Sequence, residues 1–206
     1  MPTLIFPFDS NIGYDQRKEA MMQDPRLIWL TGLSGSGKTT IALRLEHYFF
    51  LKGFKVFILD GDNVRNGLCR DLGFCEEDRK ENLRRVGEVS RLMLDAGLTV
   101  ICAFISPSAE DRMAIKKIVG EERFIEVYVN CSLKVCEERD VKGLYAKARK
   151  GIIPNFTGIS APYDPPVLPD IEVHTAEETV EESMYKIIKL VEPSIRLQSL
   201  QSHYCI

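Results

Sequence analysis

A glycine-rich segment at residues 32–39 carries the clearest chemistry in the sequence. It reads Gly-Leu-Ser-Gly-Ser-Gly-Lys-Thr, which has the spacing Gly-x4-Gly-Lys-Thr. Glycines let the backbone turn tightly around a phosphate, and the N–H groups of such a loop and of a following helix attract negative charge. Lys38 is expected to reach the β- and γ-phosphates of a nucleotide, and the Thr39 hydroxyl to bind Mg²⁺. The pattern predicts a P-loop for a nucleoside triphosphate, made by Gly32, Leu33, Ser34, Gly35, Ser36, Gly37, Lys38, Thr39 and Thr40.

The P-loop alone does not separate molecular switches, motors and kinases, because all three classes share it. An ordinary glycine-rich turn between a strand and a helix is the weaker alternative. No asparagine in the sequence is followed by lysine, which argues against the guanine-binding Asn-Lys-x-Asp motif of the switches. Motors and recombination ATPases are generally larger and need partner surfaces. A small-molecule kinase is therefore the favoured class.

Two carboxylates follow the next apolar run, which covers residues 55–59. Asp60 and Asp62 come directly after this run, and ligands bind at the carboxyl ends of strands in open α/β sheets. There, carboxylates can hold Mg²⁺ through its waters and orient or deprotonate an attacking hydroxyl. Residues 60–63 are also expected to form a turn stabilised by its own side chains, a reading that does not compete with catalysis.

Six motifs beyond the P-loop occur in one order along the chain. They lie at residues 60–65, 71–74, 78–85, 104–107, 139–145 and 156–159. With them the sequence resembles the adenylylsulfate kinase family over about residues 27–191. This resemblance implies transfer of the γ-phosphate of ATP, with Mg²⁺, to the 3′-hydroxyl of adenosine 5′-phosphosulfate. It also implies a homodimer, and it leaves open whether a separate ATP sulfurylase binds the chain.

The resemblance assigns the acceptor site residue by residue. Arg65, Arg79 and Lys142 match positions that grip the sulfate–phosphate anhydride, a task that suits the planar guanidinium. Phe74 and Phe156 match aromatic positions that sandwich the adenine. Taken alone, Arg79 would be interpreted as part of a solvated helix face and Phe74 as a core residue. Only the ordered set of motifs favours a substrate-binding role for both. The remaining expected substrate contacts are Asp62, Asn82, Ile105, Ser106, Gly143 and Leu144.

Two further expectations and two departures from the family pattern concern the residues around this site. Ser106 follows the third strand, so its hydroxyl is expected over the cleft as a substrate contact, and a covalent phosphoserine role is kept as an alternative. The segment 139–158 is expected to be a mobile lid, with Arg139 over the donor adenine. Ser108 and Ala109 replace the aromatic residue and arginine that many family members carry. Residues 153–155 are more apolar and stiffer than the common pattern.

Elements that could position these residues alternate along the chain. Strands are expected at 27–30, 55–59, 98–105, 124–129 and 171–173, and helices at 38–51, 78–95, 109–119, 132–138 and 177–191. The alternation predicts an α/β fold of the three-layer P-loop NTPase type, a mostly parallel sheet with helices on both faces. A charged segment at 139–151 and a proline-rich loop at 151–170 follow the fourth strand, and long loops in compact domains are often functional.

Composition narrows the remaining classes. The 206 residues carry a formal net charge of −3, so no basic surface for nucleic acid is expected. No membrane span or signal pattern is expected, and the six cysteines lack a disulfide-framework spacing, which favours a cytoplasmic protein. Residues 1–25 form an extension that could join an interface or fold over the site, ahead of a kinase domain at 26–206. A kinase for another nucleotide or small alcohol and a non-catalytic nucleotide sensor are the alternatives.

Overall fold

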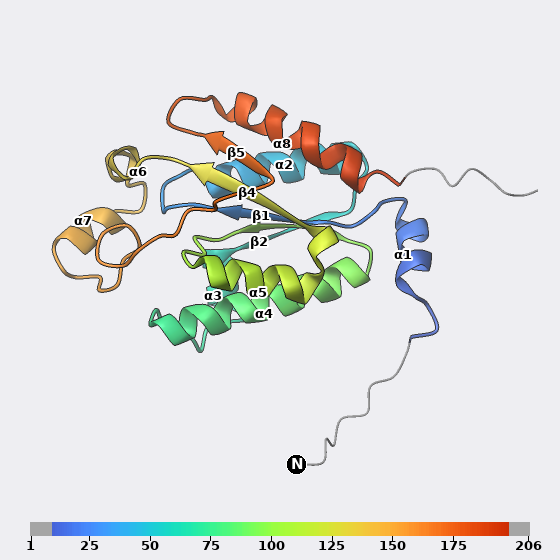
Figure 1. Cartoon of the computed structure of the whole chain (residues 1–206), viewed down its shortest axis with the longest axis horizontal. Helices are drawn as coiled ribbons and strands as arrows, with labels where there is room; N and C mark the ends of the chain where they lie inside the picture. The colour runs from blue at the N-terminus through green and yellow to red at the C-terminus, as the bar shows by residue number, and fades with distance from the viewer. Residues whose placement is uncertain (1–9, 198–206) are drawn as a thin grey trace, which may run out of the picture.

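The computed structural model describes residues 10–197 (Figure 1). Its five strands form one parallel sheet in the order β2-β3-β1-β4-β5. The strands are β1 (Leu27–Thr31), β2 (Val56–Asp60), β3 (Thr99–Ala103), β4 (Phe124–Asn130) and β5 (Ile171–His174). The expected parallel α/β sheet is confirmed, with strand ends that differ from the expected ones by a few residues.

Side chains of the central strand β1 alternate between the two faces of the sheet, as strand geometry requires. Ile28 and Leu30 pack on α2 (Lys38–Leu51) and α8 (Val180–Ile195). Leu27 and Trp29 pack on α4 (Glu76–Asp95) and α5 (Ala109–Val119) on the opposite face. Because both faces are covered, every residue of β1 is buried, and the sheet is a rigid platform for the loops at its carboxyl edge.

Two short helices lie where the sequence predicted none. Gly61–Asn66 is the helix α3, not a turn, because the Asp60 carboxylate accepts a hydrogen bond from the Asp62 N–H at 3.0 Å and so caps it. Leu144–Arg149 is the helix α7, inside the segment taken as merely charged. The Asp140 carboxylate accepts hydrogen bonds from the N–H groups of Tyr145 and Ala146, both at 3.0 Å, and thereby starts this helix. Helix α6 (Leu133–Arg139) precedes it, and both lie beyond the carboxyl ends of the strands (Figure 1).

The last helix, α8, begins and ends later than expected. Thr179 and Glu182 form a capping box at its start. Pro193 lies within its last turn, where the missing N–H removes a single hydrogen bond, so the helix continues to Ile195.

Helix α1 (Tyr14–Met21) packs at the amino edge of the sheet, on the opposite side from α6 and α7 (Figure 1). The buried Gln23 side chain fastens this extension by donating to the carbonyls of Lys55 and Gly97, each at 2.9 Å. Residues 10–25 therefore do not cover the carboxyl edge of their own sheet. The expectation for residues 1–9 lies outside the described residues.

Candidate active site

The loop between β1 and α2 is built to bind an anion. The carbonyl groups of residues 32–36 all accept hydrogen bonds from the surrounding protein. Within residues 10–197, by contrast, the N–H groups of Leu33, Ser34, Gly35 and Gly37 donate to no acceptor. A loop with satisfied carbonyls and unsatisfied N–H groups, at the start of a helix, presents positive charge to a phosphate.

Glycine at position 32 is required by the geometry of this loop. Its φ is +150°, and a Cβ there would lie 2.5 Å from the carbonyl oxygen of Val129. Gly35 and Gly37 also have positive φ, of +75° and +100°, a region that costs residues with a Cβ. These two glycines let the loop turn back so that α2 can begin at Lys38.

The Lys38 ammonium is folded onto the loop. Its Nζ donates to the carbonyls of Gly32, at 2.9 Å, and of Leu33, at 2.7 Å, and the residue is 8% exposed. Burial lowers the pKa of Lys38 to about 8, although nearby acidic groups oppose this shift. The charged form of Lys38 is therefore disfavoured in the free protein, and the negative charge of a bound triphosphate would stabilise it.

The two residues expected to serve Mg²⁺ lie in direct contact. The Thr39 hydroxyl donates to Asp60 Oδ2 at 2.8 Å. A hydroxyl and a carboxylate are hard oxygen donors of the kind that Mg²⁺ prefers, with water and phosphate oxygens completing the shell. No group of three or more His, Cys, Asp and Glu side chains suited to a metal occurs in the described part of the chain. The residues present thus fit a metal ion brought in with the nucleotide.

Asp62 lies beside this pair, one residue into α3, and its carboxylate is exposed. It forms an ion pair with Lys142, which comes from the segment between α6 and α7. The structure therefore joins a predicted catalytic carboxylate to a predicted substrate-binding cation. Both side chains are more than half exposed, so neither is confined to this partner.

Arg65 and Arg79 form a second cationic centre. Both guanidinium groups lie over the ring of Phe74, at 4.3 Å and 6.0 Å from its centroid. Within residues 10–197 neither is ion-paired with a carboxylate. Burial lowers the pKa of Arg79, and the charge of Arg65 lowers it further. Two like charges on one exposed aromatic ring make a site for an anion attached to a planar group.

The lid residues reach both centres. Arg79 donates to the carbonyl of Asn155 at 2.8 Å and to Thr157 Oγ1 at 3.1 Å. Tyr145 donates to the Ser34 carbonyl at 2.9 Å. Arg139 donates to the Gly35 carbonyl at 3.4 Å and to Thr175. The lid is therefore folded over the P-loop and the cationic centre.

Several predicted site residues are less available than expected. Phe156 is 8% exposed, because its ring packs edge-on against Tyr145 at 5.0 Å. Gly143 has a φ of +64° at the start of α7, and Leu144 is packed against the same small core. Asn82 is buried in α4, and its Oδ1 has no hydrogen-bond partner among the described residues. A buried acceptor without a protein partner is suited to a donor on a bound molecule.

The expectation that the Ser106 hydroxyl projects over the cleft is wrong. Ser106 is 3% exposed, and its Oγ accepts from Trp29 Nε1 at 3.0 Å and donates to Thr31 Oγ1 at 2.9 Å. The backbone at Ser106 has a φ of +38°, which turns the side chain inward toward β1. Ile105 lies directly before it, and its carbonyl accepts from the Thr31 hydroxyl at 2.8 Å.

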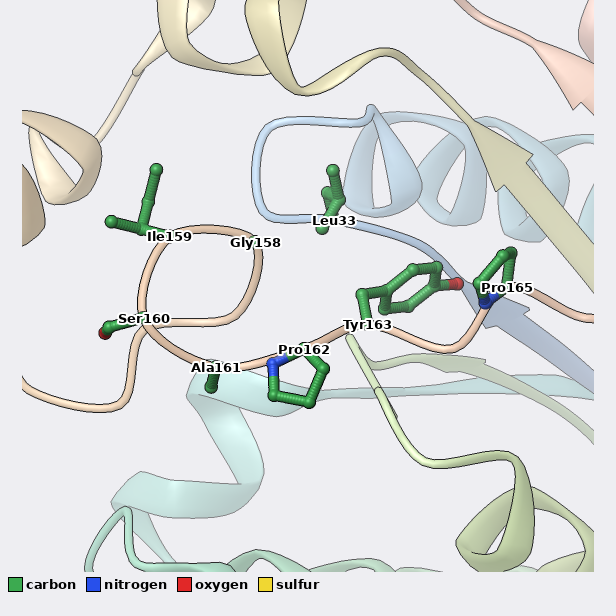
Figure 2. A pocket seen from close by; sticks show the side chains of 8 residues that line it. All are labelled: Leu33, Gly158, Ile159, Ser160, Ala161, Pro162, Tyr163 and Pro165. Carbon is green, nitrogen blue, oxygen red and sulfur yellow. The ribbon is translucent and has the colours of Figure 1, made fainter.

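An open hollow of about 590 Å³ lies between the P-loop and the proline-rich loop. Figure 2 shows Leu33 on one side of it and residues 158–163 on the other, with the Tyr163 hydroxyl directed toward β1. The Tyr163 hydroxyl lies 3.1 Å from Thr31 Oγ1. The sequence predicted no role for Tyr163, Tyr145 or Thr175. Each forms a hydrogen bond with a group far away in the chain, and the residue type alone does not reveal such a partner.

Comparisons with known proteins agree with this geometry. The profile of the adenylylsulphate kinase family matches residues 24–174. The adenylyl-sulfate kinase of Staphylococcus epidermidis is 51% identical over 181 residues, which cover 88% of this chain and 91% of the relative.

Solved structures give the same result. The APS kinase CysC of Mycobacterium tuberculosis, in complex with AMPPNP and APS, is 44% identical with a TM-score of 0.79 and covers 82% of this chain and 98% of its own. A hexameric APS kinase from Thiobacillus denitrificans is 26% identical with a TM-score of 0.63, and the match covers 84% of this chain and 30% of that one.

Proposed function

The chain belongs to the adenylylsulfate kinase family, and we propose that it transfers the γ-phosphoryl group of ATP to the 3′-hydroxyl of adenosine 5′-phosphosulfate. The products are ADP and 3′-phosphoadenylylsulfate. The observation that carries this proposal is the presence of two anion-binding centres joined by one short helix. Asp62 and Arg65 are three residues apart in α3, so they share a face of that helix and link the P-loop side to the cationic centre.

On the donor side, the unsatisfied N–H groups of the P-loop bind the phosphates. Lys38 leaves the carbonyls of Gly32 and Leu33 and pairs with the β- and γ-phosphates. Thr39 and, through water, Asp60 would hold Mg²⁺, and the ion would supply charge neutralisation at the transferred group. Arg139 lies against the edge of the loop, where it contacts the donor adenine.

On the acceptor side, Arg65, Arg79 and Lys142 bind the sulfate–phosphate anhydride. Phe74 offers an exposed ring to the adenine, and Phe156 forms the opposite wall once the lid rearranges from its packing on Tyr145. The orphan Oδ1 of Asn82 accepts a hydrogen bond from the acceptor. Because the anhydride is anionic and is attached to the adenosine, two guanidinium groups beside one aromatic ring suit this acceptor.

Asp62 orients the acceptor hydroxyl and takes its proton as the new O–P bond forms and the bond to the ADP oxygen breaks. Phosphoryl transfer needs mainly positioning and charge neutralisation, which the two centres provide. Closing of the 139–158 lid excludes water, which otherwise competes with the 3′-hydroxyl. Lys142 must then leave Asp62 for the anhydride, so substrate binding frees the carboxylate for its task.

A coupled assay of ADP release tests this function. It compares adenosine 5′-phosphosulfate, adenosine 5′-phosphate and no acceptor. We expect release that depends on the sulfated nucleotide, because the paired arginines are matched to its anhydride. Equal rates with the unsulfated nucleotide would indicate a kinase for another acceptor, and binding of ATP without release would indicate a nucleotide sensor.

Assembly and location complete the proposal. We place the enzyme in the cytoplasm as a homodimer, with the ATP sulfurylase reaction as the source of its acceptor. Among residues 10–197 no helix combines the length and the apolar character that crossing a bilayer requires. The relative from Thiobacillus denitrificans is described as hexameric. Light scattering checks the dimer directly, since the chain mass is 23.4 kDa.

A further inference from the structure

A buried arginine lies behind the site and contacts three separate elements. Arg112 of α5 is 3% exposed. Its Nε donates to Glu126 Oε1 at 2.8 Å, its Nη1 to the Ser106 carbonyl at 2.7 Å, and its Nη2 to the Asp164 carbonyl at 2.8 Å. A buried cation is costly unless its donors are satisfied. Each of the three nitrogens of this guanidinium donates one hydrogen bond, two of them to backbone carbonyls of loops that border the active site.

The Asp164 peptide is held from both sides. Its carbonyl accepts from Arg112, and its N–H donates to the Pro107 carbonyl at 2.8 Å. The preceding residue, Tyr163, contacts Thr31 Oγ1 and stacks on Tyr128 with the ring centroids 6.2 Å apart. The chain returning from the lid is thus fixed at residues 163–164 to the loop after β3 and to the end of β1.

The lid itself, residues 139–158, is held differently. Lys142 near its start pairs with Asp62, and Arg79 donates to Asn155 near its end; both cations are exposed or only half-buried. These contacts can be exchanged for substrate contacts, whereas the contacts of Arg112 are inside the protein. The lid can therefore rearrange, while the segment that follows it is fixed at residues 163–164.

We propose that Arg112 is a positioning residue that fixes the segment following the lid, at residues 163–164, to the loop at residues 105–107, so that the lid closes on the acceptor about this fixed point. The proposal rests on the function given above. It accounts for the unusual backbone at Ser106, whose φ of +38° is uncommon for a residue with a side chain. Arg112 holds the carbonyl of that residue, and Thr31 and Trp29 hold its hydroxyl.

The consequence is an effect on the acceptor rather than on ATP. In the proposed function, Arg112 contacts the loop at residues 105–107 and the segment at 163–164, which border the acceptor side. The P-loop carbonyls are held by other residues, namely Lys38, Arg139, Tyr145 and Thr175. Loss of the Arg112 fork should therefore raise the KM for adenosine 5′-phosphosulfate by about tenfold or more, since small misplacements at a site of this kind cost on the order of a hundredfold. The KM for ATP should change less than about twofold, because Arg112 does not hold the P-loop carbonyls.

The test compares four variants of the full chain. Arg112→Gln removes the fork, and Arg112→Lys keeps the charge but has its donors on a single nitrogen, without the planar fork that spans the three acceptors. Glu126→Gln weakens the ion pair and leaves both carbonyl contacts in place. Arg123→Gln is the matched control, because Arg123 is also partly buried and ion-paired, with Asp95 at 2.7 Å, away from the site.

We expect the raised acceptor KM with Arg112→Gln, a smaller rise with Arg112→Lys, and wild-type constants with Glu126→Gln and Arg123→Gln. Hydrogen exchange provides a readout independent of turnover: the Asp164 amide should exchange at least about tenfold faster in Arg112→Gln, as expected when a local contact opens. Kinetics and exchange that match the Arg123→Gln control would overturn the proposal. If Arg112→Gln does not fold, Arg112→Lys gives the same comparison. An inactive wild-type protein would refute the proposed function instead, while the exchange measurement would still decide the role of Arg112.

Discussion

The proposed donor and acceptor sides of this site are built in contrasting ways. On the donor side, the P-loop follows a fully buried strand, and all five carbonyls of residues 32–36 are held by protein donors. On the acceptor side, Arg65, Phe74 and Asp62 are exposed or only half-buried, and they contact one another or the lid. The donor loop is preformed apart from the Lys38 ammonium, which must exchange the carbonyls of Gly32 and Leu33 for phosphate. On the acceptor side, most of the side chains must change partners.

This difference follows from what each side must bind. Triphosphate binding by backbone N–H groups needs a rigid loop, which the sheet supports. The acceptor has to be enclosed so that water is excluded, and enclosure requires a part that moves. Substitutions of Lys38 and Asp62, which act on the reacting groups, should lower kcat most, and those of the other acceptor-side groups should mainly raise the acceptor KM.

Lys38→Ala should have the largest effect. It removes the buried ammonium that neutralises the transferred group, and we expect kcat to fall by about a thousandfold or more, as for other preorganised charges at a reacting centre. Steady-state ADP release measures this loss. Lys117→Ala, an exposed lysine on α5, is the control and should retain activity. A Lys38→Ala enzyme within tenfold of wild type would mean that the donor side is not organised around this residue.

Asp62→Asn should rank second. The amide keeps the shape of the side chain but loses its basicity, and we expect kcat to fall by about a hundredfold to ten-thousandfold, the usual contribution of a general base. The KM for ATP should stay near its wild-type value, because the Thr39–Asp60 contact is unaffected. A selective rise in the acceptor KM with unchanged kcat would assign Asp62 to binding alone.

The two sides also differ in how far sequence could predict them. The P-loop is local, so the type and spacing of residues 32–39 were sufficient to predict it. The parallel sheet was predictable because buried parallel strands are short apolar runs between helices. Helix α7 was missed because two of its supports lie outside the helix. The Asp140 carboxylate caps its start, and the Phe156 ring packs against Tyr145.

Ser106 shows the limit of sequence reasoning most clearly. From its position alone, a serine that follows a strand at the carboxyl edge of the sheet is expected to face the cleft. The hydroxyl turns inward instead, because Trp29 and Thr31, more than seventy residues earlier, present a donor and an acceptor. In the same way Arg112 looks like part of a solvated charged segment, and only the fold shows it to be buried.

Arg79→Lys sharpens the contrast from the acceptor side. Lysine keeps the charge but cannot donate from a planar fork to Phe74, Thr157 and Asn155 as the guanidinium does. We expect the acceptor KM to rise by about tenfold to thirtyfold, with less change in kcat, because the loss falls on binding. Arg84→Lys is a suitable control, since Arg84 pairs with Glu81 on the exposed face of the same helix. Equal effects of the two substitutions would remove Arg79 from the site.

A proton-linked effect should follow from Lys38. Burial lowers its pKa to about 8 in the free protein, so above pH 8 the amine is largely neutral, and the phosphates of ATP favour its charged form. Binding of ATP at pH 8.5–9 should take up a proton, by up to roughly one per site, and affinity should fall as pH rises through 8. Calorimetry in buffers of different ionisation enthalpy measures this uptake. It should vanish below about pH 7, where Lys38 is already charged, and in Lys38→Ala at every pH.

Ser106→Ala should have the smallest effect on turnover and a clear effect on stability. The hydroxyl is buried between Trp29 Nε1 and Thr31 Oγ1, so its removal leaves a buried indole N–H without its acceptor, which costs about 1–3 kcal/mol of unfolding free energy. Because the hydroxyl does not face the cleft, kcat should stay within about tenfold of wild type, far from the loss expected when a covalent nucleophile is removed. Urea unfolding and steady-state kinetics on one preparation separate the two effects, and Ser108→Ala, which loses only a helix cap, is the matched control. Loss of turnover with unchanged stability would instead support the phosphoserine role. Ser106 would then belong, despite its burial, to the acceptor side, where side chains change partners.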